Sequence, residues 1–222
     1  MRALYHDNED LFKYVSLHSG DNITDIVKLD YVYDTLFIED ANNLTLPEWS
    51  KSVFPEGKWK ELRDISFTVD TLTDELKRLK GGPWVKEVIQ HTELMEAAVN
   101  KSSEVRLFMY SGHDTTVAPV LHTLGVFNGL APPYASMVML ETFQSSGDGN
   151  TYLRLSYHND SNHEPYILTI PGCEAMCSFN KFKQIMKKYV PEDILKECGI
   201  DNSGQSSGTM QRVCHKQKIL PF

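Results

Sequence analysis

A histidine and an aspartate stand side by side where a strand-like run meets a helix, and they are the residues of this chain best suited to chemistry. The apolar run Arg106–Tyr110 delivers His113 and Asp114 to the mouth of a turn just before the helix begins. There an imidazole can bind an oxyanion while the neighbouring carboxyl protonates a leaving group. A structural alternative stays open, because an aspartate at this point is a good helix cap that complements the helix dipole, and the histidine then bonds only to the backbone.

A metal-dependent phosphoester hydrolase is a second class that uses such side chains, with His91, His113 and Asp114 as its ligands. That chemistry wants ligands on helices together with a second, distal aspartate, whereas His113 and Asp114 follow a strand. The sequence disfavours this class, and we predict no metal ligand.

Four cysteines allow either disulfides or a zinc site. Cys173 and Cys177 are closely spaced, as in a short disulfide loop, whereas Cys198 and Cys214 are not, although His215 lies beside Cys214. Structural zinc sites usually have a tight pair on both sides, and only the first pair is tight here. We therefore predict a disulfide between Cys173 and Cys177.

The first hundred residues are predicted to be mostly helical. Leu72, Leu76 and Leu79 lie at helical spacing. The Gly81–Gly82 pair ends that helix, and Pro83 starts another.

From residue 104 on, the pattern changes to the alternation typical of strands. The predicted strands are Val105–Tyr110, Ala135–Phe143, Tyr152–His158 and Tyr166–Ile170, with a hairpin loop at Ser145–Asn150 and a last helix at Phe179–Tyr189. The helix between the first two strands is capped by Thr115 or Thr116, which places Pro119 in its first turn, where the missing N–H costs nothing. Gly125 ends this helix.

The composition excludes two kinds of partner. The chain has 222 residues, is 41% hydrophobic and carries a formal charge of -8, so it can bury a sizeable core. Nucleic acids and anionic membranes attract clustered lysine and arginine, and an acidic chain offers little of either. We expect no nucleic-acid partner and no membrane span, since no stretch approaches the ~20 apolar residues that a bilayer needs.

Six stretches of the sequence resemble the histidine acid phosphatases of the prostatic and lysosomal type. In order along the chain they are Tyr33–Leu36, Asn43–Pro47, Met109–Val117, Asn128–Ser136, His163–Tyr166 and Leu168–Cys173 with Cys177. Their order and spacing agree with the family over residues 10 to 198. The resemblance is therefore specific, although a His-Asp pair alone would carry no such signal.

The resemblance implies a role for each residue of the pair. In that family a histidine in an N-terminal Arg-His-Gly-x-Arg-x-Pro loop attacks phosphorus, and water then hydrolyses the phosphohistidine. His113 would bind phosphate, and Asp114 would be the general acid that protonates the leaving alkoxide. The implied substrate is a phosphate monoester, cleaved at acidic pH without a cofactor.

The sequence departs from the family at the nucleophile. It has six arginines and eight histidines but no Arg-His pair, and a further upstream phosphate-binding arginine is also absent. Loss of a covalent nucleophile costs on the order of 10⁶ in turnover, so we expect the isolated chain to be inactive. A family disulfide is replaced by Ile38 and Met137, and the family partner of Cys198 is absent, which leaves Cys198 free or paired with Cys214.

The resemblance also implies the fold. We expect an α/β protein with a partial histidine-phosphatase fold, in which a mixed sheet is flanked by helices and joined by part of a smaller helical domain. The expected parts are a mainly helical portion at residues 1–100, the C-terminal part of the catalytic domain at 101–198 and a flexible tail at 199–222. Strands of the absent half would lie beside the strand ending at Tyr110, so an exposed edge invites aggregation or a homodimer. We expect the sequence to be a fragment.

Four asparagines fit the N-glycosylation pattern: Asn22, Asn43, Asn100 and Asn159. Together with the family resemblance they predict a secreted or lysosomal protein, although the chain begins without the profile of a secretory signal. Two functions remain open. One is an acid phosphatase represented by its C-terminal portion, and the other is a non-catalytic secreted protein that binds a partner or a phosphorylated ligand.

Overall fold

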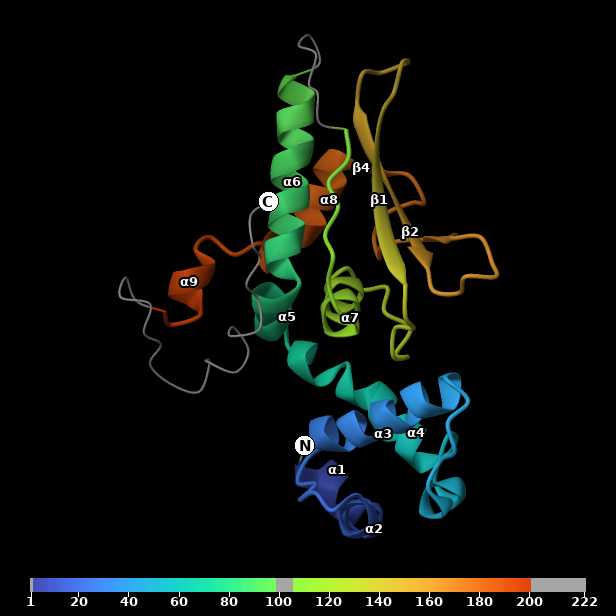
Figure 1. Ribbon diagram of the computed structural model, residues 1–222. Helices are drawn as coiled ribbons and strands as arrows, with labels where there is room; N and C mark the ends of the chain where they lie inside the picture. The colour runs from blue at the N-terminus through green and yellow to red at the C-terminus, as the bar shows by residue number, and fades with distance from the viewer. Residues whose placement is uncertain (1, 99–105, 201–222) are drawn as a thin grey trace. The chain divides into compact units, whose positions relative to one another are not determined.

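The computed structural model describes residues 2–98 and 106–200, and the chain divides into two compact units (Figure 1). The first runs to Val69 and includes Gly129–Ala131, and the second holds Asp70–Asn128 and the chain from Pro132 on. In the described part of the chain, residues up to Ala98 form helices and the strands come later. Every helix of this described part is too short or too polar to cross a bilayer.

The first unit is built from helices. Their bounds are α1 Arg2–His6, α2 Glu9–Ser19, α3 Ile26–Ala41, the 3-10 helix η1 Glu48–Ser52 and α4 Lys58–Ser66. Asp25 caps α3, because its carboxylate accepts hydrogen bonds from the backbone N–H groups of Val27 and Lys28 at 3.1 and 3.0 Å.

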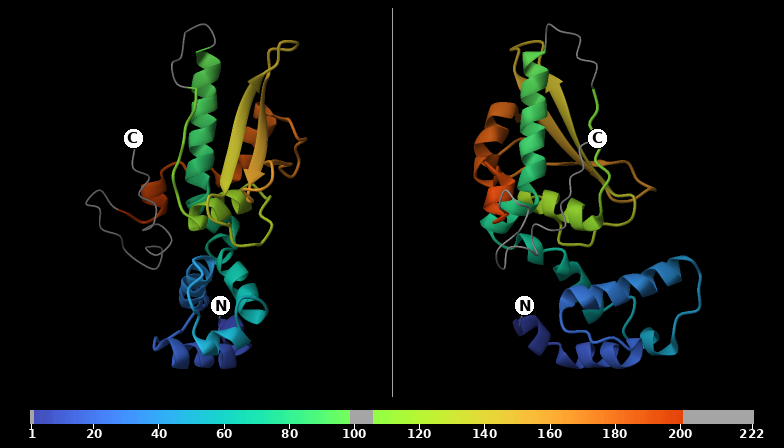
Figure 2. Two further views of the ribbon diagram at one scale, coloured as in Figure 1. Left: turned by 45° about the vertical axis from the view of Figure 1, so that its right-hand side comes forward. Right: turned by 60° about the vertical axis from the view of Figure 1, so that its left-hand side comes forward.

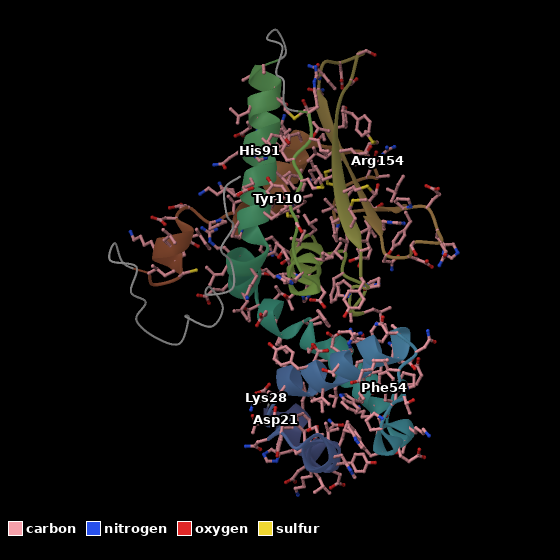
Figure 3. The ribbon with its side chains drawn as sticks, viewed as in Figure 1. Asp21, Lys28, Phe54, His91, Tyr110 and Arg154 are labelled. Carbon is pink, nitrogen blue, oxygen red and sulfur yellow. A yellow bond between two sulfur atoms is a disulfide. The ribbon has the colours of Figure 1, made fainter. Side chains whose placement is uncertain are left out.

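Trp59 is the largest fully buried side chain in the core of the first unit. Its indole N–H donates to the carbonyl oxygen of Leu29 at 3.1 Å, so its polar atom is satisfied. The hydroxyl of Tyr33 donates to the carbonyl of Pro55 at 2.7 Å, and the ring of Phe54, labelled in Figure 3, packs edge-on against Tyr33. These contacts hold α3 and α4 together.

The second unit combines helices with a four-stranded sheet. The helices are η2 Val69–Thr71, α5 Asp74–Lys80, α6 Gly82–Ala97, α7 Asp114–Thr123, α8 Phe179–Met186, η3 Lys187–Tyr189 and α9 Ile194–Glu197, and the strands are β1 Met137–Gln144, β2 Thr151–His158, β3 Tyr166–Leu168 and β4 Cys177–Ser178. Figure 2 shows β1 and β2 as a long hairpin standing beside α6. The predicted α/β class is confirmed.

Strand β2 is the centre of the sheet and pairs antiparallel with β1, β3 and β4. The predicted hairpin is confirmed: Met137 lies opposite His158 at one end, and at the other the N–H of Ser145 donates to the carbonyl of Asn150 at 2.9 Å. Such pairing is local in sequence, so the alternating pattern and the turn residues suffice to specify it.

One apolar core joins the sheet to the helices. Leu153 and Leu155 of β2, Val85 of α6 and Phe182 of α8 are all buried in it, as is Leu124 directly after α7. The shared core fixes α6, α7 and α8 relative to β2.

The glycine pair between α5 and α6 has a packing role as well as the predicted helix-breaking one. A Cβ atom on Gly81 would lie 2.3 Å from Oγ1 of Thr123, and one on Gly82 would lie 2.1 Å from the carbonyl oxygen of Tyr189. Since real Cβ atoms do not approach other atoms so closely, only glycine allows α7 and η3 to pack on this junction.

The disulfide predicted between Cys173 and Cys177 is confirmed. Cys198, which is 3% exposed, is also disulfide-bonded. The alternative of a free thiol at Cys198 is therefore wrong.

The strand predicted at Val105–Tyr110 is not formed by its described residues, 106–110. The backbone there is not bridged to another strand, and in the described part of the sheet β1 pairs only with β2. Leu107 and Met109 are 75% and 79% exposed. An extended segment becomes a strand only when a neighbour accepts and donates its backbone hydrogen bonds, and residues 106–110 have no such neighbour among the described residues.

Candidate functional site

The stretch that starts at residue 106 runs down to α7 (Figure 1), and His113 and Asp114 lie where it enters the helix. His113 is the N-cap, with extended backbone angles of φ −114° and ψ 166°, and Asp114 is the first helical residue. The predicted caps, Thr115 and Thr116, are wrong, and Pro119 lies in the second turn instead of the first. The reason is that Thr116 lies within the first turn of the helix, where its Oγ1 accepts a hydrogen bond from the N–H of the N-cap residue His113 at 3.3 Å.

The side chains of the pair differ in exposure. His113 is exposed, whereas Asp114 is half-buried and one of its carboxylate oxygens accepts from the N–H of Thr115 at 2.6 Å. The N–H groups of the first turn carry the positive end of the helix dipole, which favours a negative charge there. An acidic group is thus held at the start of α7 with an exposed imidazole next to it in the chain.

Gly112 precedes the pair because the backbone passes close to the helix. A Cβ atom at this position would lie 3.2 Å from both Cβ and Oγ1 of Thr116. A larger residue here would displace Thr116, whose Oγ1 accepts from the His113 N–H. Glycine therefore allows this hydrogen bond to form.

The remainder of α7 anchors the site in the second unit. Ala118, Val120 and Leu121 are buried. On the half-buried His122, Nδ1 lies 2.7 Å from Oγ1 of Thr71, and burial, with the positive charge of Lys77 as a smaller cause, lowers the pKa of this histidine. His122 is therefore a packing residue of α7.

Tyr110, within the stretch, lies near two side chains of α6, Glu87 and His91; of these three, the sequence suggested a functional role only for His91, as a ligand in the disfavoured metal-dependent class. Oη of Tyr110 lies 3.4 Å from Nδ1 of His91 on α6, and both are labelled in Figure 3. Burial is the main cause that raises the pKa of Tyr110, and the neighbouring carboxylate of Glu87 adds to it. In the sequence, the spacing of Glu87 and His91, four residues apart, is the one feature that indicates that they share a helix face and could contact the same neighbour.

Two further histidines of the second unit, His158 and His163, lie close to each other. His163 pairs with Asp160 at 2.6 Å, and Nε2 of His158 lies 3.0 Å from the carbonyl of His163, all at the end of β2 and in the loop after it. Within residues 2–98 and 106–200, no group of three or more His, Cys, Asp or Glu side chains is arranged to hold a metal ion.

The glycosylation candidates differ in accessibility. Asn22 and Asn43 are exposed, Asn159 is half-buried, and Asn100 lies outside the described residues. Ile38 and Met137, at the positions where the resemblance implies a cysteine pair, are 43% and 47% exposed.

A family profile for the histidine phosphatase superfamily (branch 2) matches residues 7–158 of the chain. The chain belongs to this superfamily. The matched range holds His113 and Asp114 and ends with β2, and the resemblance found in the sequence is thereby confirmed.

Curated relatives of this histidine phosphatase chain include acid phosphatases of two types. It is 36% identical to the prostatic acid phosphatase of Homo sapiens over 183 residues, which are 79% of this chain and 45% of that protein. It is 34% identical to the lysosomal acid phosphatase of Rattus norvegicus over 170 residues, 75% of this chain and 39% of that protein. The chain thus spans less than half the length of these relatives.

Among solved structures, the phytase from Citrobacter braakii has a similar fold. It superimposes with a TM-score of 0.53 at 15% sequence identity, covering 79% of this chain and 51% of the phytase. At this identity the likeness concerns the fold alone, and it agrees with the α/β class of the histidine phosphatase chain.

Proposed function

We propose that this chain is part of an acid phosphatase that hydrolyses phosphate monoesters, with His113 binding the phosphate and Asp114 as the general acid. The observation that carries the proposal is the placement of the pair at the start of α7, inside the range that matches the superfamily. An exposed imidazole is accessible to an incoming phosphate, and a carboxyl next to it in sequence can give a proton to the leaving group.

The proposed reaction has two steps, transfer of the phosphoryl group to a histidine and its hydrolysis. A histidine nitrogen outside these 222 residues attacks phosphorus, the bond from phosphorus to the leaving oxygen breaks, and the proton of the Asp114 carboxyl goes to that oxygen. Water then attacks phosphorus of the phosphohistidine, the nitrogen–phosphorus bond breaks to release inorganic phosphate, and a proton of the water returns to the Asp114 carboxylate. The carboxyl must be protonated when the first step begins, which favours work at acidic pH.

The sequence itself limits what the chain does alone. It contains no Arg-His pair, so it offers no counterpart of the loop that holds the family nucleophile. We propose that the 222 residues are inactive in isolation and keep only a weak affinity for phosphate.

The experiment that tests the site is a phosphate titration of the chain followed by NMR of its histidine side chains. We expect His113 to shift on addition of inorganic phosphate and His113→Ala to weaken binding several-fold. His163→Ala removes another exposed histidine elsewhere and serves as the control. Unchanged phosphate affinity in His113→Ala, or an equal loss in both variants, would refute the assignment.

A second candidate, a non-catalytic secreted binding protein, is favoured by the same absence of an Arg-His pair. The intact mass and N-terminal sequence of the deglycosylated native protein separate the two. A protein much heavier than the 25.3 kDa of this chain, with an Arg-His-Gly segment near its start, supports the enzyme. A protein of 25.3 kDa that begins at Met1 supports the binding protein.

We also propose a secreted or lysosomal location. The exposure of Asn22 and Asn43 supports it, because a glycan can be attached only to an accessible side chain, and so does the disulfide between Cys173 and Cys177, which is typical of oxidising compartments. A mass decrease on treatment with an N-glycosidase is the expected result.

A further inference from the structure

Side chains of α6 contact the stretch that carries the candidate site. Glu87 and His91 are four residues apart, so they lie on one face of the helix. Phe108 and Tyr110 are two apart in an extended segment, so they point to one side. The rings of His91 and Phe108 stack with centroids 3.6 Å and planes 6° apart, and Oη of Tyr110 lies 3.4 Å from Nδ1 of His91 (Figure 3).

The hydroxyl of Tyr110 lies near two titratable side chains of α6. Burial is the main cause that raises the pKa of Tyr110, and the neighbouring carboxylate of Glu87 adds to it. A tyrosine has one proton to donate and a carboxylate can only accept, so a Tyr110 hydroxyl that donates to Glu87 can still accept from His91 when Nδ1 carries the proton. At 3.4 Å the contact between Tyr110 and His91 is long for a hydrogen bond, and the stacking of His91 on Phe108 supports it.

The opposite side of the stretch has no comparable support. Leu107 and Met109 are 75% and 79% exposed, and the described backbone of residues 106–110 is not paired with a strand. Among the described residues, the contacts to α6 are therefore the main restraint on this part of the chain.

The path from Tyr110 to the site is short. Only Ser111 and Gly112 separate it from His113, and Gly112 lies against Thr116, whose Oγ1 accepts from the His113 N–H. A restraint on Tyr110 is thus transmitted through a few backbone bonds to the entrance of α7.

We propose that Glu87, His91 and Tyr110 are positioning residues that fix the stretch carrying His113 and Asp114 against α6. This inference rests on the proposed function of the pair. The three residues act through the backbone and hold the imidazole and the carboxyl in place before phosphate arrives, so that less order is lost on binding.

The test compares two tyrosine variants of the chain. Tyr110→Phe keeps the ring and removes the hydroxyl, and Tyr152→Phe removes a tyrosine that donates to the Asp148 carboxylate at 3.0 Å in the β1–β2 hairpin. We expect amide hydrogen exchange at residues 111–116 to quicken roughly three- to tenfold in Tyr110→Phe, the effect of losing about one hydrogen bond. Tyr152→Phe should leave exchange there unchanged.

A second pair of variants separates positioning from packing. Glu87→Gln keeps an acceptor for the Tyr110 hydroxyl and should restore most of the protection that Glu87→Ala loses. If Tyr110→Phe leaves exchange at 111–116 unchanged, or if Tyr152→Phe quickens it equally, the inference is overturned. The exchange data need no phosphate, so they decide the positioning role independently of the His113→Ala titration, which decides the proposed function.

Discussion

Two interpretations of Asp114 share the same position at the start of α7. In a structural role in the first turn it needs only an oxygen that accepts from a backbone N–H group, and its bond to the Thr115 N–H at 2.6 Å provides one. As a general acid it needs a proton that can be given to a leaving oxygen. Asparagine retains the first property and lacks the second, because its amide oxygen accepts a hydrogen bond but its amide group has no acidic proton to give.

Asp114→Asn therefore tests the acid at the residue scale. In the full-length active protein, we expect hydrolysis of an alkyl phosphate to slow by roughly 10²- to 10⁴-fold, and that of an activated aryl phosphate, whose leaving group needs little protonation, to slow far less. The ratio of kcat/KM for the two substrates is the measurement. Asp193→Asn, at the cap of α9, is the control, and equal losses on both substrates in Asp114→Asn would remove the assignment.

At the scale of elements, the junction of α5 and α6 depends on the absence of a side chain. A Cβ atom on Gly82 would lie 2.1 Å from the Tyr189 carbonyl, whereas one on Gly147, in an exposed loop, would meet nothing closer than 3.9 Å. We expect Gly82→Ala to lower the free energy of unfolding by about 1–3 kcal/mol through forced displacement of packed elements.

Gly147→Ala should change stability by less than about 0.5 kcal/mol. Chemical denaturation of the two variants provides the comparison. Equal midpoints would mean that η3 moves away from the junction without cost, and the packing role of Gly82 would be wrong.

The elements that the sequence predicts well are those specified by local pattern. The β1–β2 hairpin lies within two residues of its predicted bounds, and the last predicted helix, Phe179–Tyr189, is present as α8 followed by η3. The start of α7 was misplaced because the hydroxyl of Thr116 can serve a cap from either side of the helix start. The sequence alone does not show whether Thr116 is the N-cap residue or lies inside the first turn.

The strand predicted at Val105–Tyr110 failed for a different reason. The exposure of its side chains does alternate, since Leu107 and Met109 are more exposed than Phe108 and Tyr110. A strand also needs a neighbouring strand to pair with, and the alternating pattern does not indicate whether one is present. The contacts of Tyr110 with α6 were missed likewise, because they join residues 19 apart in the chain.

At the scale of the whole molecule, the exposed side of this stretch predicts self-association. Two large apolar side chains there, Leu107 and Met109, are among the most exposed of the described residues, and an extended segment with free backbone groups is a template for another chain. We expect Leu107→Ser with Met109→Ser to reduce the self-associated fraction in sedimentation velocity.

The matched control is Leu17→Ser with Leu94→Ser, since these leucines are 78% and 65% exposed on helices. Helical backbone groups are already bonded, so this pair should have a smaller effect. Equal effects would show that apolar area alone drives association and that the unpaired backbone contributes nothing.

The contacts around α5 also constrain the order in which the second unit can form during synthesis. Arg78 binds Glu197 through two hydrogen bonds of 2.6 and 2.9 Å, across 119 positions of sequence, and Gly82 meets Tyr189 nearby. A ribosome releases the stretch of His113 long before it releases these partners, whereas the β1–β2 hairpin can close as soon as it emerges. Closing so long a loop carries an entropic cost that local pairing avoids. The nascent chain therefore lacks the contacts that Glu197 and Tyr189 make at the junction of α5 and α6 until its last helices are made.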